Sequence, residues 1–131
     1  MILVDSSVWI AYFSQKKSTA ADFLDKNLDD GQDVVTLPLI ITEVLSGFRD
    51  DKDFKAAHAV LTKVPIVPIS FETYIRAAEL YRKLRKKGIT IQSPVDCLIA
   101  QVCLEIGASI FSLDKDFNKI SLNTSLQLVV R

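Results

Sequence analysis

The sequence predicts an α/β domain of three layers, in which helices cover both faces of a central, mostly parallel sheet of four to five short strands. Short apolar runs alternate with amphipathic stretches of helical period, which is the pattern of a parallel sheet buried on both faces. The 131 residues fit one domain, expected to span residues 1–131. With 49% hydrophobic and 24% charged residues, the composition is globular and excludes a disordered chain.

The first half of the chain is expected to contain two strands and four helices. Each expected strand is a short apolar run, and the helices begin or end near residues with capping or turn chemistry, such as Asp5, Pro38 and Gly31. The strands are expected at residues 2–4 and 34–36, and the helices at residues 8–13, 19–28, 38–47 and 54–61.

The second half is expected to contain two long helices and up to three strands. An apolar stripe of helical period runs through residues 71–87, and Gly88 ends it. The next helix, residues 94–106, opens with Ser93 at the N-cap position and stops at Gly107. Strands are expected at residues 64–69, 108–113 and 126–130, the first of them weakened by two prolines.

Five acidic residues lie at or near positions where parallel sheets bind ligands, which is beyond the carboxyl ends of the strands. Asp5 directly follows the first strand, and Asp114 and Asp116 follow the strand at residues 108–113. Glu43 lies in the expected helix that follows the second strand, and Asp96 lies in the first turn of the expected helix at residues 94–106. The helical wheel places Asp96 beside the apolar stripe of its helix, so its carboxylate is expected to be partly buried and to need a partner.

Each of these acids also has a purely structural interpretation. The alternatives are a helix N-cap for Asp5, a solvated helical position for Glu43, a capping box with Ser93 for Asp96, and a simple turn for Asp114 and Asp116. The set together is more informative, because two carboxylates 4 Å apart repel by about 4 kcal/mol at an effective dielectric of 20. Converging acids therefore need protons or cations, and oxygen ligands favour Mg²⁺ or Mn²⁺.

Charge and cysteine content restrict the partners and the compartment. The net charge is +0, which excludes the whole-molecule basic field of many DNA-binding domains. A local run of basic residues that begins at Arg76 has two interpretations, a solvated helix face or a contact with RNA backbone. Within this run, the residues expected to contact RNA are Arg82, Lys83, Arg85, Lys86 and Lys87. Cys97 and Cys103 are interpreted as reduced core thiols, and without a signal peptide or a membrane-length apolar run we expect a cytoplasmic protein.

Four blocks of the sequence resemble, in the same order, the motifs of PIN domains, and most closely those of VapC-type toxins of toxin–antitoxin pairs. The blocks are residues 2–10, 41–47, 94–100 and 112–117, and each contains one or two of the acids described above. The resemblance implies a PIN-like fold and a Mg²⁺- or Mn²⁺-dependent endoribonuclease, which hydrolyses RNA phosphodiester bonds by metal-activated water.

The resemblance also implies roles for individual residues. Asp5, Glu43 and Asp96 correspond to catalytic metal ligands; Asp114 is the first choice for the fourth position and Asp116 the second. Ser6 and Ser112 fall where the family has hydroxyl residues near the metal or the phosphate. The implied partners are an RNA substrate, a VapB-type antitoxin and a second copy of the chain in a homodimer. The alternative function is a non-catalytic PIN-like module that binds RNA or protein.

Overall fold

The computed structural model describes residues 1–14 and 16–129, and it has the expected α/β architecture. Three strands are present in the described residues: β1 (Ile2–Val4), β2 (Val34–Val35) and β3 (Ser109–Phe111). The helices there are α1 (Ser6–Phe13), α2 (Thr19–Asp29), α3 (Pro38–Ser46), α4 (Asp51–Leu61), α5 (Phe71–Lys86), α6 (Pro94–Ile106) and α7 (Asp116–Asn123).

The sheet is parallel and has the order β2-β1-β3. It therefore has three strands within the described ranges instead of the predicted four to five. The two segments expected to complete it form single bridges at opposite edges, Ile66 with Thr36 and Leu128 with Ile110. Prolines at 65 and 68 have no N–H to donate, which explains the first reduction. Val130, the last residue of the other expected strand, lies outside the described residues.

The helices confirm the predicted positions with one addition. Helix α7 was not expected, because the polar stretch at residues 114–118 has the composition of a turn. Its apolar side chains explain why it forms, since Phe117 and Ile120 are fully buried in the core. Burial of these two side chains stabilises a short helix whose own sequence propensity is modest.

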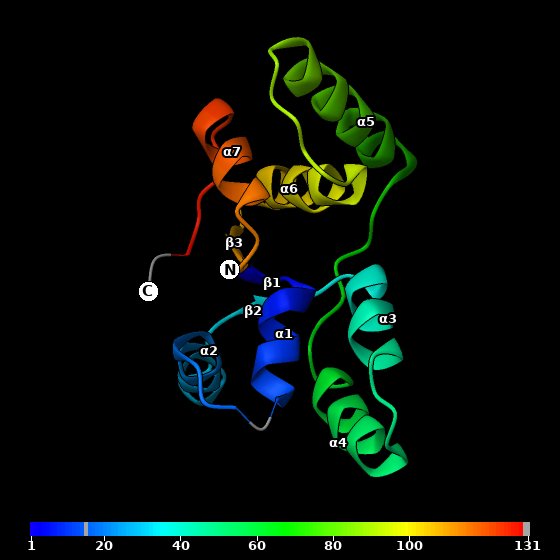
Figure 1. Cartoon of the computed structure of the whole chain (residues 1–131), viewed down its shortest axis with the longest axis vertical. Helices are drawn as coiled ribbons and strands as arrows, with labels where there is room; N and C mark the ends of the chain where they lie inside the picture. The colour runs from blue at the N-terminus through cyan, green and yellow to red at the C-terminus, as the bar shows by residue number, and fades with distance from the viewer. Residues whose placement is uncertain (15, 130–131) are drawn as a thin grey trace.

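The sheet lies between two groups of helices (Figure 1). On one side are α5, α6 and α7, and on the other are α1 to α4. Buried side chains from both groups and from the strands form a single hydrophobic cluster, which includes Leu3, Trp9, Ile99 and Phe111. In the described ranges, no helix combines the length and the apolar composition that a membrane crossing requires.

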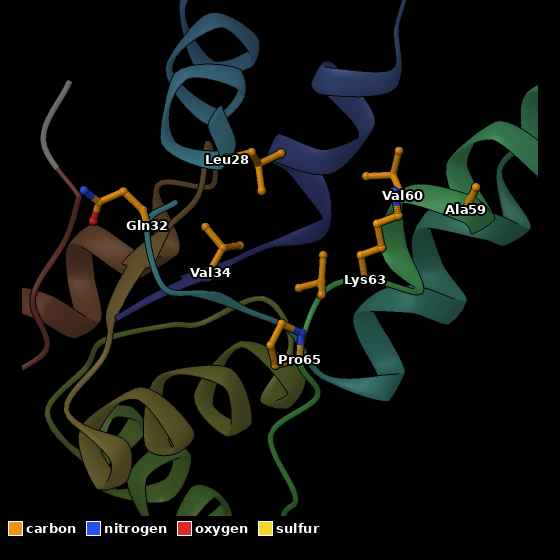
Figure 2. A pocket seen from close by; sticks show the side chains of 8 residues that line it. Leu28, Gln32, Val34, Ala59, Val60, Lys63 and Pro65 are labelled. Atoms are coloured by element: carbon orange, nitrogen blue, oxygen red, sulfur yellow. The ribbon is translucent and has the colours of Figure 1, made fainter. Parts of the chain in front are cut away.

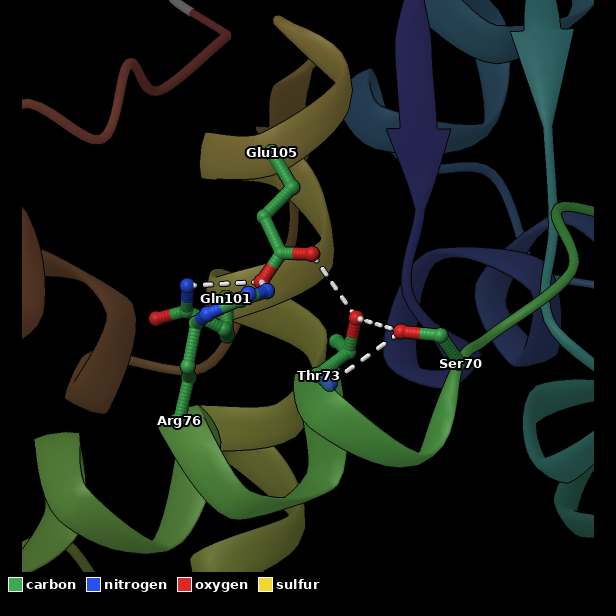
Figure 3. Close-up of polar contacts among 5 residues, drawn as sticks. All are labelled: Ser70, Thr73, Arg76, Gln101 and Glu105. Atoms are coloured by element: carbon green, nitrogen blue, oxygen red, sulfur yellow. Dashed lines mark hydrogen bonds and ion pairs between the residues drawn. The ribbon is translucent and has the colours of Figure 1, made fainter.

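Helix α5 is joined to α6 by polar contacts around Glu105 (Figure 3). The Thr73 hydroxyl donates to Oε1 of Glu105 at 2.7 Å, and the Gln101 amide donates to Oε2 at 2.8 Å. Arg76 lies 3.2 Å from the same carboxylate. These contacts, with the Gln101 hydrogen bond first, lower the pKa of Glu105. The position of α5 matters for the site described next, because the segment that follows α5 forms one of its walls.

Candidate metal-binding site

A hollow of about 410 Å³ lies at the carboxyl edge of the sheet and collects acids from four parts of the chain. Asp5 comes from the end of β1, Glu43 from α3, Asp96 from the first turn of α6, and Asp114 from the loop after β3. Side chains that are far apart in the sequence therefore share one small space. The parallel order of β1 and β3 explains this, because both strands end at the same edge.

Asp5 is almost fully buried, at 6% exposure, and it is held by hydroxyl groups. The Ser112 hydroxyl donates to Oδ2 at 2.7 Å, and the Ser7 hydroxyl donates to the same oxygen at 3.1 Å. Asp5 occupies the N-cap position of α1, but its side chain makes no capping hydrogen bond. The carboxylate is therefore oriented by neighbouring hydroxyls and not by capping the helix that it precedes.

Asp96 is the acid whose ionisation the surroundings disfavour most clearly. Desolvation by burial, followed by the charges of Asp114, Asp5, Asp116 and Glu43, raises its pKa from 3.8 to about 7. Among the described residues, its carboxylate accepts no hydrogen bond, so the capping box with the Ser93 amide does not form. Ser93 does cap α6, because its hydroxyl accepts from the Val95 amide at 3.2 Å.

Asp114 and Asp116 lie on either side of the start of α7 and have different surroundings. Oδ1 of Asp114 accepts from the Asp116 amide at 2.9 Å, and Asp114 lines the hollow. Asp116 does not line the hollow, although one of its oxygens lies within 4.8 Å of oxygens of Asp96 and Asp114. Its carboxylate accepts from the Gln92 amide at 2.8 Å and lies 3.2 Å from Nζ of Lys119.

The arrangement fits a hard divalent cation. Asp96, Asp114 and Asp116 bring oxygen atoms to within 4.8 Å of one another. Asp5 and Glu43 do not belong to this close group, but they line the same hollow as Asp96 and Asp114. Burial, followed by the charges of its acidic neighbours, raises the pKa of the Asp96 carboxyl, and a bound cation would relieve the repulsion among these acids as a proton does. The donor set contains oxygen atoms alone, which Mg²⁺ and Mn²⁺ prefer.

The two serines implied by the resemblance are both at the site. Ser112 bonds to Asp5 and also accepts from the Asp114 amide at 3.0 Å, so it connects two of the acids. Ser6 lines the hollow, and its hydroxyl is 3.5 Å from Oδ1 of Asp5. Sequence reasoning missed Ser7, whose hydroxyl bonds to Asp5 and accepts from the Leu113 amide at 3.0 Å.

Gln92 was also missed, together with the position of Ser93 in the wall of the hollow. Neither residue has a pattern that singles it out, because their role depends on how the segment before α6 folds back toward α7. A signal for Ser7 was present, since it is the second hydroxyl residue after Asp5 in the first block of the resemblance.

The basic run lies apart from the acidic hollow, at the end of α5. Arg82, Lys83, Lys86 and Lys87 surround a separate surface hollow with Glu79. Arg85 does not belong to it, because its guanidinium carbon lies 5.5 Å from the centre of the Tyr81 ring. The structure thus gathers four of the five predicted basic residues on one surface.

Another hollow, of about 440 Å³, lies between α2 and α4 (Figure 2). Its lining is mostly apolar and includes Leu28, Val34 and Val60, with Lys63 as its charged member. It contains none of the five acids, so it is not part of the candidate metal site.

Comparison with protein families gives a match over almost the whole chain. The PIN domain model matches residues 2–122. Ribonuclease VapC11 from Mycobacterium tuberculosis is 34% identical over 129 residues, which cover 97% of this chain and 96% of the relative.

Solved structures share the fold at lower sequence identity. The VapBC2 complex from Rickettsia felis, bound to a DNA fragment from its promoter, has a chain that matches with a TM-score of 0.77, 17% identity and 98% coverage of both chains. VapC20 from Mycobacterium tuberculosis, described as a toxin that cleaves the sarcin-ricin loop, matches with a TM-score of 0.71 and 17% identity over 91% of this chain and 94% of that one.

Proposed function

Because the chain belongs to the PIN-domain family, we propose that it is a divalent-metal-dependent endoribonuclease and the toxin of a toxin–antitoxin pair. The observation that carries the proposal is the convergence of Asp5, Glu43, Asp96 and Asp114 in one hollow. The name of the 34%-identical relative, a VapC ribonuclease, supports hydrolysis of RNA. The toxin complexes among the structures with the same fold support the assignment to such a pair.

Asp5, Glu43, Asp96 and Asp114 are the residues that would hold the cation, which we propose to be Mg²⁺ or Mn²⁺. An ion held by these residues would supply a water molecule of lowered pKa and a positive charge against a phosphate. The chain contributes the orientation of the ligands. Ser112 and Ser7 fix the Asp5 carboxylate before any ion arrives, so little rearrangement is required on binding.

The basic surface at the end of α5 would bind RNA outside the reaction centre. Arg82, Lys83, Lys86 and Lys87 supply positive charge that the acidic hollow lacks. Neutralising phosphates in this way strengthens binding without selecting a sequence. Arg85 takes part less, because its charge already lies over Tyr81.

The proposed partners are a VapB-type antitoxin and a second copy of the chain. The antitoxin is supported by the VapBC complexes with the same fold, and the homodimer rests on the resemblance alone. We propose a cytoplasmic location, in which the buried thiols of Cys97 and Cys103 remain reduced.

The test is cleavage of total cellular RNA by the purified chain in Mg²⁺, in Mn²⁺ and in EDTA. Asp96→Asn removes one ligand, and Asp53→Asn is the matched control, because Asp53 is an exposed acid on α4. We expect discrete fragments with 5′-phosphate ends from the unmodified chain and from Asp53→Asn, and none in EDTA or from Asp96→Asn. RNA binding without cleavage in every metal would favour the non-catalytic binding module.

A further inference from the structure

The segment between α5 and α6 forms one wall of the acidic hollow and is held from two sides. Gln92 and Ser93 line the hollow, while the side chain of the preceding Ile91 is buried in the core at 2% exposure. On the other side, the backbone is bonded to α7: the Gln92 amide donates to Asp116 at 2.8 Å, and Nζ of Lys119 donates to the Thr90 carbonyl at 3.1 Å.

Both oxygens of Asp116 are engaged in this contact. Oδ2 accepts from the Gln92 amide, and Oδ1 lies 3.2 Å from the Lys119 ammonium group. The side chain is buried, at 8% exposure for the residue, and does not line the hollow. One oxygen of Asp116 lies within 4.8 Å of oxygens of Asp96 and Asp114, but both of its oxygens already have partners, and a cation beside it would also meet the positive charge of Lys119. Asp114 lines the hollow directly and is therefore the better placed of the two acids to hold an ion there.

The wall that this contact holds in place supplies neutral hydrogen-bond donors. Of the residues that line the hollow in the described ranges, none is Lys or Arg. A phosphodiester that enters it can therefore meet the hydroxyl of Ser93 and the carboxamide of Gln92, which both belong to this wall. Gln92 is exposed, and its NH₂ group offers two donors to a phosphate oxygen or a base edge without charge.

We propose that Asp116 is a positioning residue which, with Lys119, fixes the segment at residues 90–93 so that the Gln92 carboxamide contacts the RNA strand at the acidic hollow. The contact with RNA rests on the proposed function. The fixing of the segment by Asp116 does not, and it can be measured on the metal-free protein.

The first measurement is the hydrogen exchange of the backbone amide of Gln92, followed by NMR. In Asp116→Ala the amide has no acceptor, and we expect exchange to accelerate about fivefold, as for removal of one hydrogen bond. In Asp116→Asn a carboxamide oxygen can still accept, so protection should be retained. Asp114→Asn is the matched control and should leave the Gln92 amide protected. Unchanged exchange in Asp116→Ala would overturn the proposal.

The second measurement separates positioning from metal binding by titration with Mn²⁺. Asp116→Ala should bind Mn²⁺ within about threefold of the unmodified chain, whereas removal of a ligand in Asp114→Asn should weaken binding by about 10-fold or more. Equal losses of affinity in the two variants would make Asp116 a ligand and overturn its assignment as a positioning residue.

The third measurement is steady-state cleavage of a defined RNA. Gln92→Ala and Asp116→Ala should each raise KM about 10-fold with little change in kcat, because they remove an interaction that is equal in the ground and transition states. The double variant should be no worse than either single one, and Asp116→Asn should restore KM. Additive effects, or a fall in kcat alone, would overturn the shared role. A chain that cleaves no RNA overturns the proposed function and the role of Gln92, while exchange still decides whether Asp116 holds the segment.

Discussion

At the scale of single residues, Asp96 is the acid of the site whose pKa is raised by its surroundings. Its pKa is about 7 in the folded chain, whereas the ordinary pKa of an aspartate is 3.8. The folded metal-free chain therefore binds a proton at Asp96 more tightly than the unfolded chain does. The free energy of unfolding without metal should therefore fall as the pH rises from about 4 to about 7. In this window Asp96 ionises readily in the unfolded chain, whereas in the folded chain its ionisation is opposed by burial and by the neighbouring acids. Below this window the penalty vanishes, because Asp96 is protonated in both states.

Asp96→Asn should remove this dependence. We expect the variant to melt at a higher temperature than the unmodified chain at pH 8 in EDTA, and the difference to disappear near pH 4. Thermal melts at intervals of one pH unit measure it, with Asp53→Asn as the control that should follow the unmodified chain. A variant that is less stable at pH 8 would indicate that Asp96 has a structural role in α6.

How far residues are predictable depends on whether their function has a pattern in the sequence. Asp5, Asp96 and Asp114 could be chosen as candidates because each lies at a strand end or helix start, and the structure places them with Glu43 around one hollow. Glu43 needed the resemblance, since its helical position alone indicates a solvated residue. Gln92 had no signal, because its place in the wall depends on a contact with α7, a helix that was itself not predicted.

At the scale of secondary-structure elements, the buried Thr73 joins α5 to α6 by a hydrogen bond to Glu105. Thr73→Val keeps the shape of the side chain but removes the hydrogen bonds to Glu105 and Ser70. We expect the free energy of unfolding to fall by about 1–2 kcal/mol, because the bond to Glu105 is made to a charged group. Urea denaturation measures this decrease.

Thr62→Val is the matched control. Its exposed hydroxyl bonds to a carbonyl of its own helix, His58, at 2.7 Å, so it should change stability by no more than about 0.5 kcal/mol. Equal effects of the two substitutions would mean that the contact around Glu105 adds nothing beyond ordinary surface hydrogen bonding.

The basic end of α5 should contribute to RNA affinity through charge alone. Replacing Arg82, Lys83, Lys86 and Lys87 by Gln should weaken binding and reduce the slope of log K against log salt by roughly 0.7 for each phosphate that is no longer neutralised. RNA titrations over a range of salt, in the Asp96→Asn background to prevent cleavage, measure the slope. The control replaces four basic residues on or beside α4 (Arg49, Lys52, Lys55 and Lys63) and should leave it unchanged; equal slopes in the two variants would contradict an RNA surface on α5.

Among the elements, those with a strong apolar or capping pattern were predicted and those shaped by tertiary contacts were not. Helices α5 and α6 follow their apolar stripes and caps closely. The segment at residues 64–69 has strand-like composition, but its prolines limit it to one bridge. Helix α7 buries Phe117 and Ile120 in the core, and their helical spacing was overlooked because the acids just before them have the composition of a turn.

At the scale of the whole molecule, ion binding and folding should be coupled, because the proposed ligands come from four distant segments. A ligand that binds only the folded state at 100 times its Kd adds about 2.7 kcal/mol to the free energy of unfolding. We expect Mg²⁺ or Mn²⁺ to raise the melting temperature of the unmodified chain in one cooperative transition, and to have little effect on Asp96→Asn. Calorimetry at several metal concentrations tests this. Two separate transitions would contradict the single domain expected for residues 1–131.

Trp9, the one tryptophan of the chain, gives these experiments an optical signal of their own. Its indole is fully buried, stacks on Phe13 and has a ring nitrogen without a hydrogen-bond partner among residues 1–14 and 16–129. An indole in such apolar surroundings fluoresces at shorter wavelength than one in water, so the emission should shift to longer wavelength when α1 separates from the core. Because Asp5 directly precedes α1, the emission maximum of Trp9 reports, without any added label, whether the helix beside the acidic hollow is folded.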